Sequence, residues 1–310
     1  MILTVTPNPA LDVTYDVDRL VPHASHRVRQ VRERAGGKGV NVASVLALLG
    51  EPVLVTGVVG GASGDELRGD LDRRGIRHDL LAGELPTRRT VTVVSAQDGD
   101  ATAFNEPGSP WPGGLRDALV VHVERLLRVH RPAVLVVSGS VPPGFGGEGC
   151  AALVSAGRAA GSRVVLDTSQ DALVGALPSG PDVVKPNRDE LYAVTGTTDP
   201  VEGANALQTK GARHVLVSLG ADGMVLVGPD GTVRRARLPE PLRGNPTGAG
   251  DACVAAVARG LAGGSAWPDV LGDAVAWSAA AVLSPVAGEV SVQDVARLRA
   301  VVTVEDAEVR

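Results

Sequence analysis

The chain has 310 residues, of which 44% are hydrophobic, and its 30 basic and 35 acidic residues give a net charge of −5. A chain of this length and apolar content can bury a core large enough to fold unaided, and we expect a single domain over residues 1–310. The mild negative charge, without an evident basic face, argues against a nucleic-acid partner.

Short β-branched runs alternate with longer helical patterns along the chain, which is typical of βαβ units around a parallel sheet. The predicted strands are residues 2–6, 53–59, 133–138, 163–167, 182–185 and 214–218. The predicted helices are residues 39–49, 64–74, 115–129, 147–160, 200–210, 249–262 and 268–283. The sequence therefore predicts an α/β fold with a mostly parallel central sheet.

Two stretches break this alternation. Residues 13–34 are polar and read as extended chain, and residues 90–96 with 101–105 predict a hairpin around a turn at 97–100. Strands that leave a parallel sheet at these two points can pair into a small lid over its carboxyl edge. We place this lid at about residues 13–34 and 88–106.

The cellular compartment can be inferred from what the sequence lacks. Asp12, Asp16 and Asp18 interrupt the N-terminal segment where a signal peptide would be apolar, and the most apolar runs are too short to span a bilayer. The two cysteines, Cys150 and Cys253, lie far apart among small apolar residues, which favours buried thiols over a disulfide framework. We expect a cytoplasmic protein without a membrane partner.

The segment 245–251, NPTGAGD, stands directly before a predicted helix. Small residues there let backbone N–H groups converge at the helix start, where the partial positive charge favours a phosphate. The negative charge of Asp251 would repel that phosphate, which makes an aspartate unexpected at this place. Its presence is explained if Asp251 takes a proton from an attacking hydroxyl while the amides hold the phosphoryl group. The alternative is a glycine-rich turn in which Asp251 is only the N-cap.

A second glycine-rich helix start lies at residues 35–43. It lacks the spacing and terminal hydroxyl of a Walker A loop. Lys38, the Asn41 amide and the loop N–H groups suit a polyhydroxylated or anionic ligand, and the alternative is a helix cap with a solvated lysine. Asp12, which follows the first strand, can accept two sugar hydroxyls or be a simple turn former.

The segment 185–190, KPNRDE, follows an apolar strand. Asn187 and Glu190 are three residues apart and share a helix face, and their oxygens suit a Mg²⁺ ion held mostly through water. The same spacing fits an ordinary capping box. The segment 218–223 reads as a tight turn between two β runs, which alone is a weak signal.

Lysine is rare in this chain, because 27 of the 30 basic residues are arginine. A genome biased toward arginine codons explains the scarcity itself. Under such a bias Lys38 and Lys185, which both fall inside the motifs, are candidates for places where a compact ammonium is needed and a planar guanidinium will not do. Arg27 and Arg88 lie in the two lid segments and could clamp a substrate phosphate, although any single arginine is more often a surface residue.

Six segments occur together in one order: TPNPALD at 6–12, GGKGVNVA at 36–43, SGSVPPG at 138–144, KPNRDEL at 185–191, SLGADG at 218–223 and GAGD at 248–251. Together they resemble the ribokinase-like sugar kinases, and within them the phosphofructokinase B group. The resemblance runs nearly end to end. It implies an α/β/α sandwich with a β-sheet lid, a homodimer formed through that lid, and Mg²⁺ with ATP as the phosphoryl donor.

The resemblance also implies a role for each matching residue. Asp251 would be the catalytic base, with an anion hole from Gly248, Ala249 and Gly250. The ATP-binding residues would be Lys185, Asn187, Glu190, Ser218, Gly220 and Gly223, of which Asn187 and Glu190 would also organise Mg²⁺. The sugar would be held by Asp12, Gly37, Lys38 and Asn41, and its phosphate by Arg27 and Arg88.

The substrate is less constrained than the reaction. The GGKG sequence resembles 1-phosphofructokinases and tagatose-6-phosphate kinases more than the minor 6-phosphofructokinase, whereas Asn245-Pro246 resembles the tagatose-6-phosphate branch and Thr247 replaces the usual valine. We predict 1-phosphofructokinase activity, with tagatose 6-phosphate or fructose 6-phosphate as the alternative substrate. Further alternatives are a kinase of nucleosides or free sugars and a regulator that binds sugar phosphates without activity.

Overall fold

The computed structural model describes residues 1–97, 100–168, 170–284 and 286–307. Its strands are β1 (Ile2–Thr6), β2 (Ala10–Val17), β3 (Gln30–Gly36), β4 (Val53–Val59), β5 (Leu81–Ala82), β6 (Arg88–Ser95), β7 (Ala101–Asn105), β8 (Val134–Ser138), β9 (Arg163–Asp167), β10 (Val183–Val184), β11 (His214–Ser218), β12 (Met224–Val227), β13 (Val233–Arg237) and β14 (Thr303–Asp306). Its helices are α1 (Lys38–Leu48), α2 (Gly61–Arg73), α3 (Leu115–His130), α4 (Gly146–Ala159), α5 (Gln170–Ala176), α6 (Arg188–Thr195), α7 (Pro200–Thr209), α8 (Ala249–Gly263), α9 (Trp267–Val282) and α10 (Val292–Arg299).

The central sheet has ten strands in the order β14-β13-β12-β11-β10-β9-β8-β1-β4-β5. From β11 to β5 every neighbouring pair is parallel, as predicted. The antiparallel strands β12, β13 and β14 at one edge were not predicted as part of this sheet. β12 runs antiparallel to β11 because only the tight turn 219–223 joins them, which is too short for a parallel crossover.

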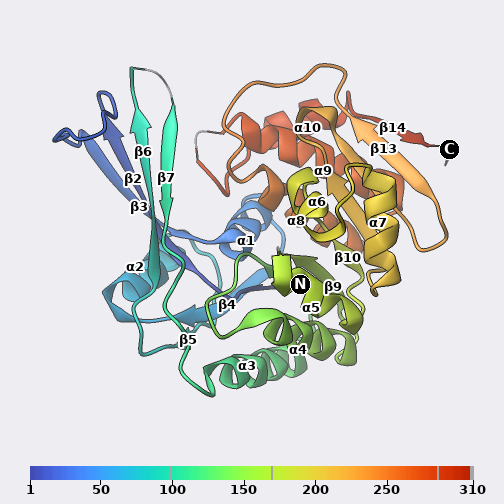
Figure 1. Cartoon of the computed structure of the whole chain (residues 1–310), viewed down its shortest axis with the longest axis horizontal. Coiled ribbons are helices and arrows are strands. Elements are labelled where there is room, and N and C mark those ends of the chain that lie inside the picture. Colours follow the sequence, from blue (N-terminus) through green and yellow to red (C-terminus); the bar gives the residue numbers. More distant parts are fainter. Residues whose placement is uncertain (98–99, 169, 285, 308–310) are drawn as a thin grey trace.

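Helices cover both faces of this sheet, which confirms the predicted α/β/α sandwich (Figure 1). Alternate residues of β8 point to opposite layers. Val134 and Val136 join the core under α1, α2, α8, α9 and α10, whereas Leu135 and Val137 join the core under α3 to α7. Because both faces are buried, the central strands consist of almost continuous apolar residues. In the described part of the chain, no helix is both long and apolar enough to cross a membrane.

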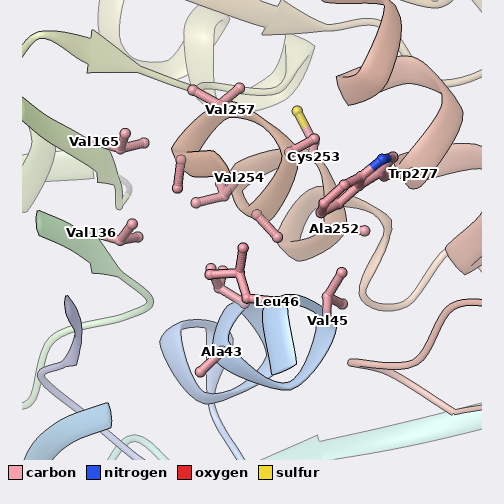
Figure 2. Close-up of a cluster of buried hydrophobic side chains, with 14 of the residues drawn as sticks. Ala43, Val45, Leu46, Val136, Val165, Ala252, Cys253, Val254, Val257 and Trp277 are labelled. Atoms are coloured by element: carbon pink, nitrogen blue, oxygen red, sulfur yellow. The ribbon is translucent and has the colours of Figure 1, made fainter. Parts of the chain in front are cut away.

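Buried apolar side chains pack helices α1 and α8 against each other. In Figure 2, Val45 and Leu46 of α1 point toward Ala252 and Val254 of α8, next to Val136 and Val165 of the sheet. All of these side chains are buried. The packing places the N-terminal turns of the two helices, with Asn41 and Asp251, side by side.

A separate four-stranded sheet, in the order β3-β2-β6-β7, stands beside the body and forms the lid (Figure 1). β2 pairs antiparallel with β3 and parallel with β6, and β6 pairs antiparallel with β7, which is the predicted hairpin. The lid begins at Ala10, earlier than expected, because Ala10 already pairs with Gly36 and Arg88. Of the predicted hairpin turn, Asp98 and Gly99 lie outside the described residues. The single-domain boundary of 1–310 stays a prediction.

Candidate active site

Asp251 is a buried carboxylate in the first turn of α8, with 6% of its surface exposed. The N-cap of α8 is Gly248, and no side chain caps the helix, so the alternative that Asp251 is the N-cap is wrong. Asn41, predicted to hold the sugar, donates from Nδ2 to Oδ2 of Asp251 at 2.8 Å. Burial, with a smaller contribution from the charge of Asp167, raises the pKa of Asp251 to about 7. A carboxylate with this pKa can accept a proton near neutral pH.

The helix start around Asp251 has the expected open backbone. Gly248 has φ = 86°, and a Cβ atom there would come 3.0 Å from the Cα of Ala287. The N–H of Ala249 donates to the carbonyl of Pro246 at 3.2 Å, whereas the first-turn N–H groups of Gly250 and Asp251 have no partner within the helix. A Cβ atom on Gly250 would lie 3.5 Å from Nζ of Lys185. The N-terminus of α8 thus presents amides next to a cation, which is the electrostatic setting for a phosphate.

Asp167, at the end of β9, binds both lysines of the site and was not predicted as a site residue. Its Oδ1 lies 3.2 Å from Nζ of Lys185 and its Oδ2 lies 3.6 Å from Nζ of Lys38. Ser138 Oγ also donates to Oδ2 at 3.0 Å. Burial opposes the charge of Asp167, but the two ammonium groups outweigh it and hold the pKa of Asp167 below its ordinary value.

Lys38 contacts two carboxylates of the body. Its Nζ lies 3.6 Å from Asp167 and 3.7 Å from Oε1 of Glu190, so it links the Asp167 cluster to α6. The charge of Asp167 outweighs burial and raises the pKa of Lys38. Gly37, before it, has φ = 96°, and a Cβ atom there would come 2.9 Å from Cγ2 of Thr6. A glycine therefore lets α1 begin close against β1.

Asn187 and Glu190 form the full capping box at the start of α6. Oδ1 of Asn187 accepts from the N–H of Glu190 at 2.8 Å, and Oε2 of Glu190 accepts from the N–H of Asn187 at 2.9 Å. Oε1 of Glu190 is left to face Lys38. Among the described residues, no group of three or more His, Cys, Asp or Glu side chains could hold a metal ion. A Mg²⁺ ion placed here would have Oε1 of Glu190, which also faces Lys38, as a ligand and would be held mostly through water.

The turn 218–223 lies next to this capping box, because Ser218 and Asn187 are paired by an isolated parallel bridge. Gly223 has φ = 85°, and a Cβ atom there would overlap the carbonyl oxygen of Ala236 on β13. Gly220 has φ = 64° and faces open space. The turn thus continues the carboxyl edge of the sheet beyond β11 as exposed backbone.

Asp12 and Arg88 lie on the lid side of the site. Asp12 is directly opposite Arg34 and Thr90 in the lid sheet, and its carboxylate occupies the space that a side chain at Gly36 would need. Burial raises the pKa of Asp12 to about 6, although the charge of Arg88 opposes this rise.

Arg88 is held by neutral oxygen atoms. It donates to the carbonyls of Asn8 at 3.2 Å and Glu106 at 3.0 Å, and to Oγ1 of Thr90 at 3.4 Å. Burial lowers the pKa of Arg88. In the described parts of the chain, no carboxylate lies within ion-pair distance of this guanidinium, so its charge stays available for an anion.

Arg27 lies at the other end of the lid. It is exposed in the loop between β2 and β3, in which Arg29 pairs with Asp18. The outermost pair of the β2–β3 ladder is Asp16 with Gln30, four residues beyond Asp12, or about 14 Å along the strand. A single chain therefore does not bring Arg27 to Asp12 and Arg88.

Three comparisons place the chain among known proteins. The profile of the pfkB family carbohydrate kinases matches residues 6–294. A 1-phosphofructokinase of Xanthomonas campestris is 40% identical over 270 residues, which cover 84% of this chain and 83% of that protein. A possible 1-phosphofructokinase of Thermotoga maritima has a TM-score of 0.89 at 26% identity, covering 99% of this chain and 100% of that one. The tetrameric inhibited form of phosphofructokinase-2 from Escherichia coli has a TM-score of 0.87 at 28% identity, covering 96% and 98%.

The raised pKa of Asp251 predicts a stability effect that does not depend on any substrate. Between pH 3.8 and about 7 the folded protein holds a proton on Asp251 that the unfolded chain releases, so folding loses stability as pH rises through this window. Asp251→Asn removes this loss. In chemical denaturation, the free energy of unfolding of the variant minus that of the wild type should increase by roughly 2–4 kcal/mol from pH 4 to pH 8. Asp12 is present in both proteins and cancels, and a pH-independent difference would mean that Asp251 has an ordinary pKa.

Proposed function

The chain belongs to the pfkB family of carbohydrate kinases, and from this premise we propose that it transfers the γ-phosphoryl group of ATP to fructose 1-phosphate, which yields fructose 1,6-bisphosphate. The observation that carries the reaction is the buried Asp251 with a pKa of about 7, in a helix turn whose amides can bind a phosphate. The choice of fructose 1-phosphate is supported by the Xanthomonas and Thermotoga relatives. Tagatose 6-phosphate and fructose 6-phosphate remain the alternative substrates.

In this proposal Asp251 is the general base. Asn41 holds Oδ2, so we assign Oδ1 to take the proton from the sugar hydroxyl as its oxygen attacks the γ-phosphorus. The hydrogen bond from Asn41 also fixes the orientation of the carboxylate. Because Asp251 is buried, little water competes with the sugar hydroxyl for the phosphoryl group.

The amides at the start of α8 and the ammonium of Lys185 would stabilise the charge of the transferring group. Lys185 is 5% exposed, and its pKa is raised because the charge of Asp167 outweighs burial, so it stays cationic. Lys38 adds a second ammonium, which lies between the carboxylates of Asp167 and Glu190. Asp167 holds both lysines in place before any nucleotide binds.

We place the nucleotide along the carboxyl edge of β10 and β11. Asn187, Ser218, Gly220 and Gly223 form a continuous surface there, through the bridge between Ser218 and Asn187. Mg²⁺, which would be held through water at Glu190, would neutralise part of the phosphate charge of ATP.

We place the sugar between Asp251 and the lid. Above its pKa of about 6, Asp12 is a carboxylate that can accept sugar hydroxyls, and Arg88 offers a cation with no carboxylate partner to the substrate's own phosphate. With a neutral sugar, only Asp12 and Glu106, which lie beyond ion-pair distance, would balance that partly buried charge. Arg27 stays a predicted ligand of this phosphate, although within a single chain it lies far from Asp12 and Arg88.

We further propose that the lid sheet forms a homodimer interface in the cytoplasm. Val31 on β3 and Phe104 on β7 are 54% and 56% exposed, which is unusual for large apolar residues on a sheet that a partner does not cover. The relative from Escherichia coli has an inhibited form that is tetrameric. Both cysteines are free and buried, as suits a reducing compartment.

A substrate panel tests the proposed function. With Mg-ATP, coupled ADP release should be fastest with fructose 1-phosphate, slower with tagatose 6-phosphate and fructose 6-phosphate, and near background with free fructose and nucleosides. Asp251→Asn should lower kcat by about 10²–10⁴-fold, because the general base is lost. A wild-type preference for a free sugar or nucleoside would contradict the substrate assignment. A fall of kcat by less than about tenfold in the variant would contradict the role of Asp251.

Arg88→Ala tests the site of the substrate's phosphate. The variant should lose roughly 10²-fold in kcat/KM for fructose 1-phosphate, the size expected for a lost charge-assisted hydrogen bond, and little of its low activity on fructose. Arg89→Ala is the matched control, because Arg89 is its neighbour on β6 and is exposed. Equal losses of Arg88→Ala on both sugars would show that Arg88 supports the lid instead.

A further inference from the structure

An ion pair joins the lid to the C-terminal part of the body. Nη1 of Arg34, on β3, lies 2.6 Å from Oε1 of Glu289, in the segment 286–291 that leads into α10. The Arg34 side chain is 18% exposed and that of Glu289 is 44% exposed, so the pair is shielded from water mainly at its arginine end. Shielded pairs with short contacts interact more strongly than exposed ones.

Both ends of this pair lie next to residues of the active site. Arg34 is directly opposite Asp12 in the β2–β3 ladder. At the other end, a Cβ atom on Gly288 would come 3.0 Å from Oδ1 of Asn41, and Ala287 packs against Gly248 at the start of α8. The segment that carries Glu289 therefore touches the residue that holds Asp251 and the N-cap of its helix.

Other charged side chains lie around the pair. Asp70 on α2 accepts from the N–H of Ala35 at 2.9 Å and lies 3.4 Å from Nη1 of Arg74. Burial, together with the charge of Arg34, lowers the pKa of Arg74, whereas Asp70 and Glu289 oppose this. Arg34 is thus paired with Glu289, whereas Arg74 is paired with Asp70 on its own helix. Loss of Glu289 would leave Arg34 without its ion-pair partner and with a repelling cation, Arg74, on the body side.

We propose that Arg34 and Glu289 form a latch that sets the separation between Asp12 on the lid and Asp251 in the body, and that both are positioning residues for the sugar. Beside the latch, β3 ends at Gly36, and Gly37 with φ = 96° makes the connection to α1 in the body. A displacement of about 1 Å between groups that hold a substrate can cost 10²-fold in rate. The consequence for the sugar rests on the proposed function, whereas the contact between lid and body does not.

The test uses Glu289→Gln, Arg34→Gln, the double variant and Arg32→Gln. Arg32 is the matched control, because it lies on the same strand and pairs with Asp16 at 3.1 Å, but wholly within the lid. Glu289→Gln should raise KM for fructose 1-phosphate by about 5–10-fold and leave KM for ATP within about twofold, whereas loss of general stability would move both. The double variant should be no worse than the poorer single variant, because both remove one interaction. Arg32→Gln should match the wild type.

Three kinetic results would overturn the latch. A lower KM for the sugar phosphate in Glu289→Gln would show that Glu289 competes with the substrate for Arg34. Losses that multiply in the double variant would show two independent roles. An equal loss in Arg32→Gln would show an effect of lid charge alone.

A measurement on the free protein separates the latch from the proposed substrate. In Glu289→Gln, amide hydrogen exchange should become faster in both segments 30–36 and 286–291. In Arg32→Gln, exchange in both segments should stay at the wild-type rate. If the wild type phosphorylates no sugar phosphate, the proposed function fails, and the exchange result still decides the latch. Unchanged exchange in both segments of Glu289→Gln would overturn it.

Discussion

Asp167 carries a negative charge with only 1% of its surface exposed, and the rest of the site depends on how that charge is balanced. Lys185 and Lys38 supply two positive charges, so the cluster of three side chains has a net charge of +1 before any ligand binds. Removing Asp167 would leave Lys185 buried without a partner, which typically costs several kcal/mol. The same negative charge also contributes to the raised pKa of Asp251. One carboxylate thus fixes the cations for a phosphate and helps to make its neighbour a better proton acceptor.

The fold brings these groups together through two simple features. The strands β8, β9, β10 and β11 are parallel neighbours, so Ser138, Asp167, Lys185 and Ser218, at or just beyond their ends, lie along one edge. Ligands of open α/β sheets bind outside the carboxyl ends of their strands. The close packing of α1 on α8 then sets Asn41 against Asp251 (Figure 2). The lid supplies Asp12 and Arg88 from the other side.

Local patterns in the sequence predicted the parts of the site that depend on local structure. For Asn187 and Glu190 the spacing offered a capping box as the alternative to a Mg²⁺ site, and the structure shows that box, whereas the Mg²⁺ role stays a prediction. The small residues before Asp251 predicted an open helix start. The sequence did not predict Asp167 as a site residue, because it ends an ordinary apolar strand. Its contacts with two lysines become evident only from the strand order β8-β9-β10. The available signal was an aspartate at the carboxyl end of a predicted parallel strand.

Long-range geometry explains the remaining differences. Arg27 and Arg88 both fall in lid segments, but the ladder register places them at opposite ends of the lid. The pair of Arg34 with Glu289 joins residues 255 positions apart, which no local pattern records. The strands β13 and β14 are short and carry charged residues at the sheet edge, and α5 and α10 have only seven and eight residues, so their apolar periodicity is weak.

The central claim is that Asp251 accepts the proton, and the pH dependence of kcat/KM for the sugar phosphate tests it most directly. Asp251 must be deprotonated to act, so the rate should rise with pH through a limb near 7. Asp12 and the substrate phosphate also titrate near pH 6, and Asn41→Ala separates them from Asp251. The hydrogen bond from Asn41 lowers the pKa of Asp251, so its loss should move only this limb to higher pH. A limb near pH 4, or one that Asn41→Ala leaves in place, would contradict the assignment of Asp251 as the base.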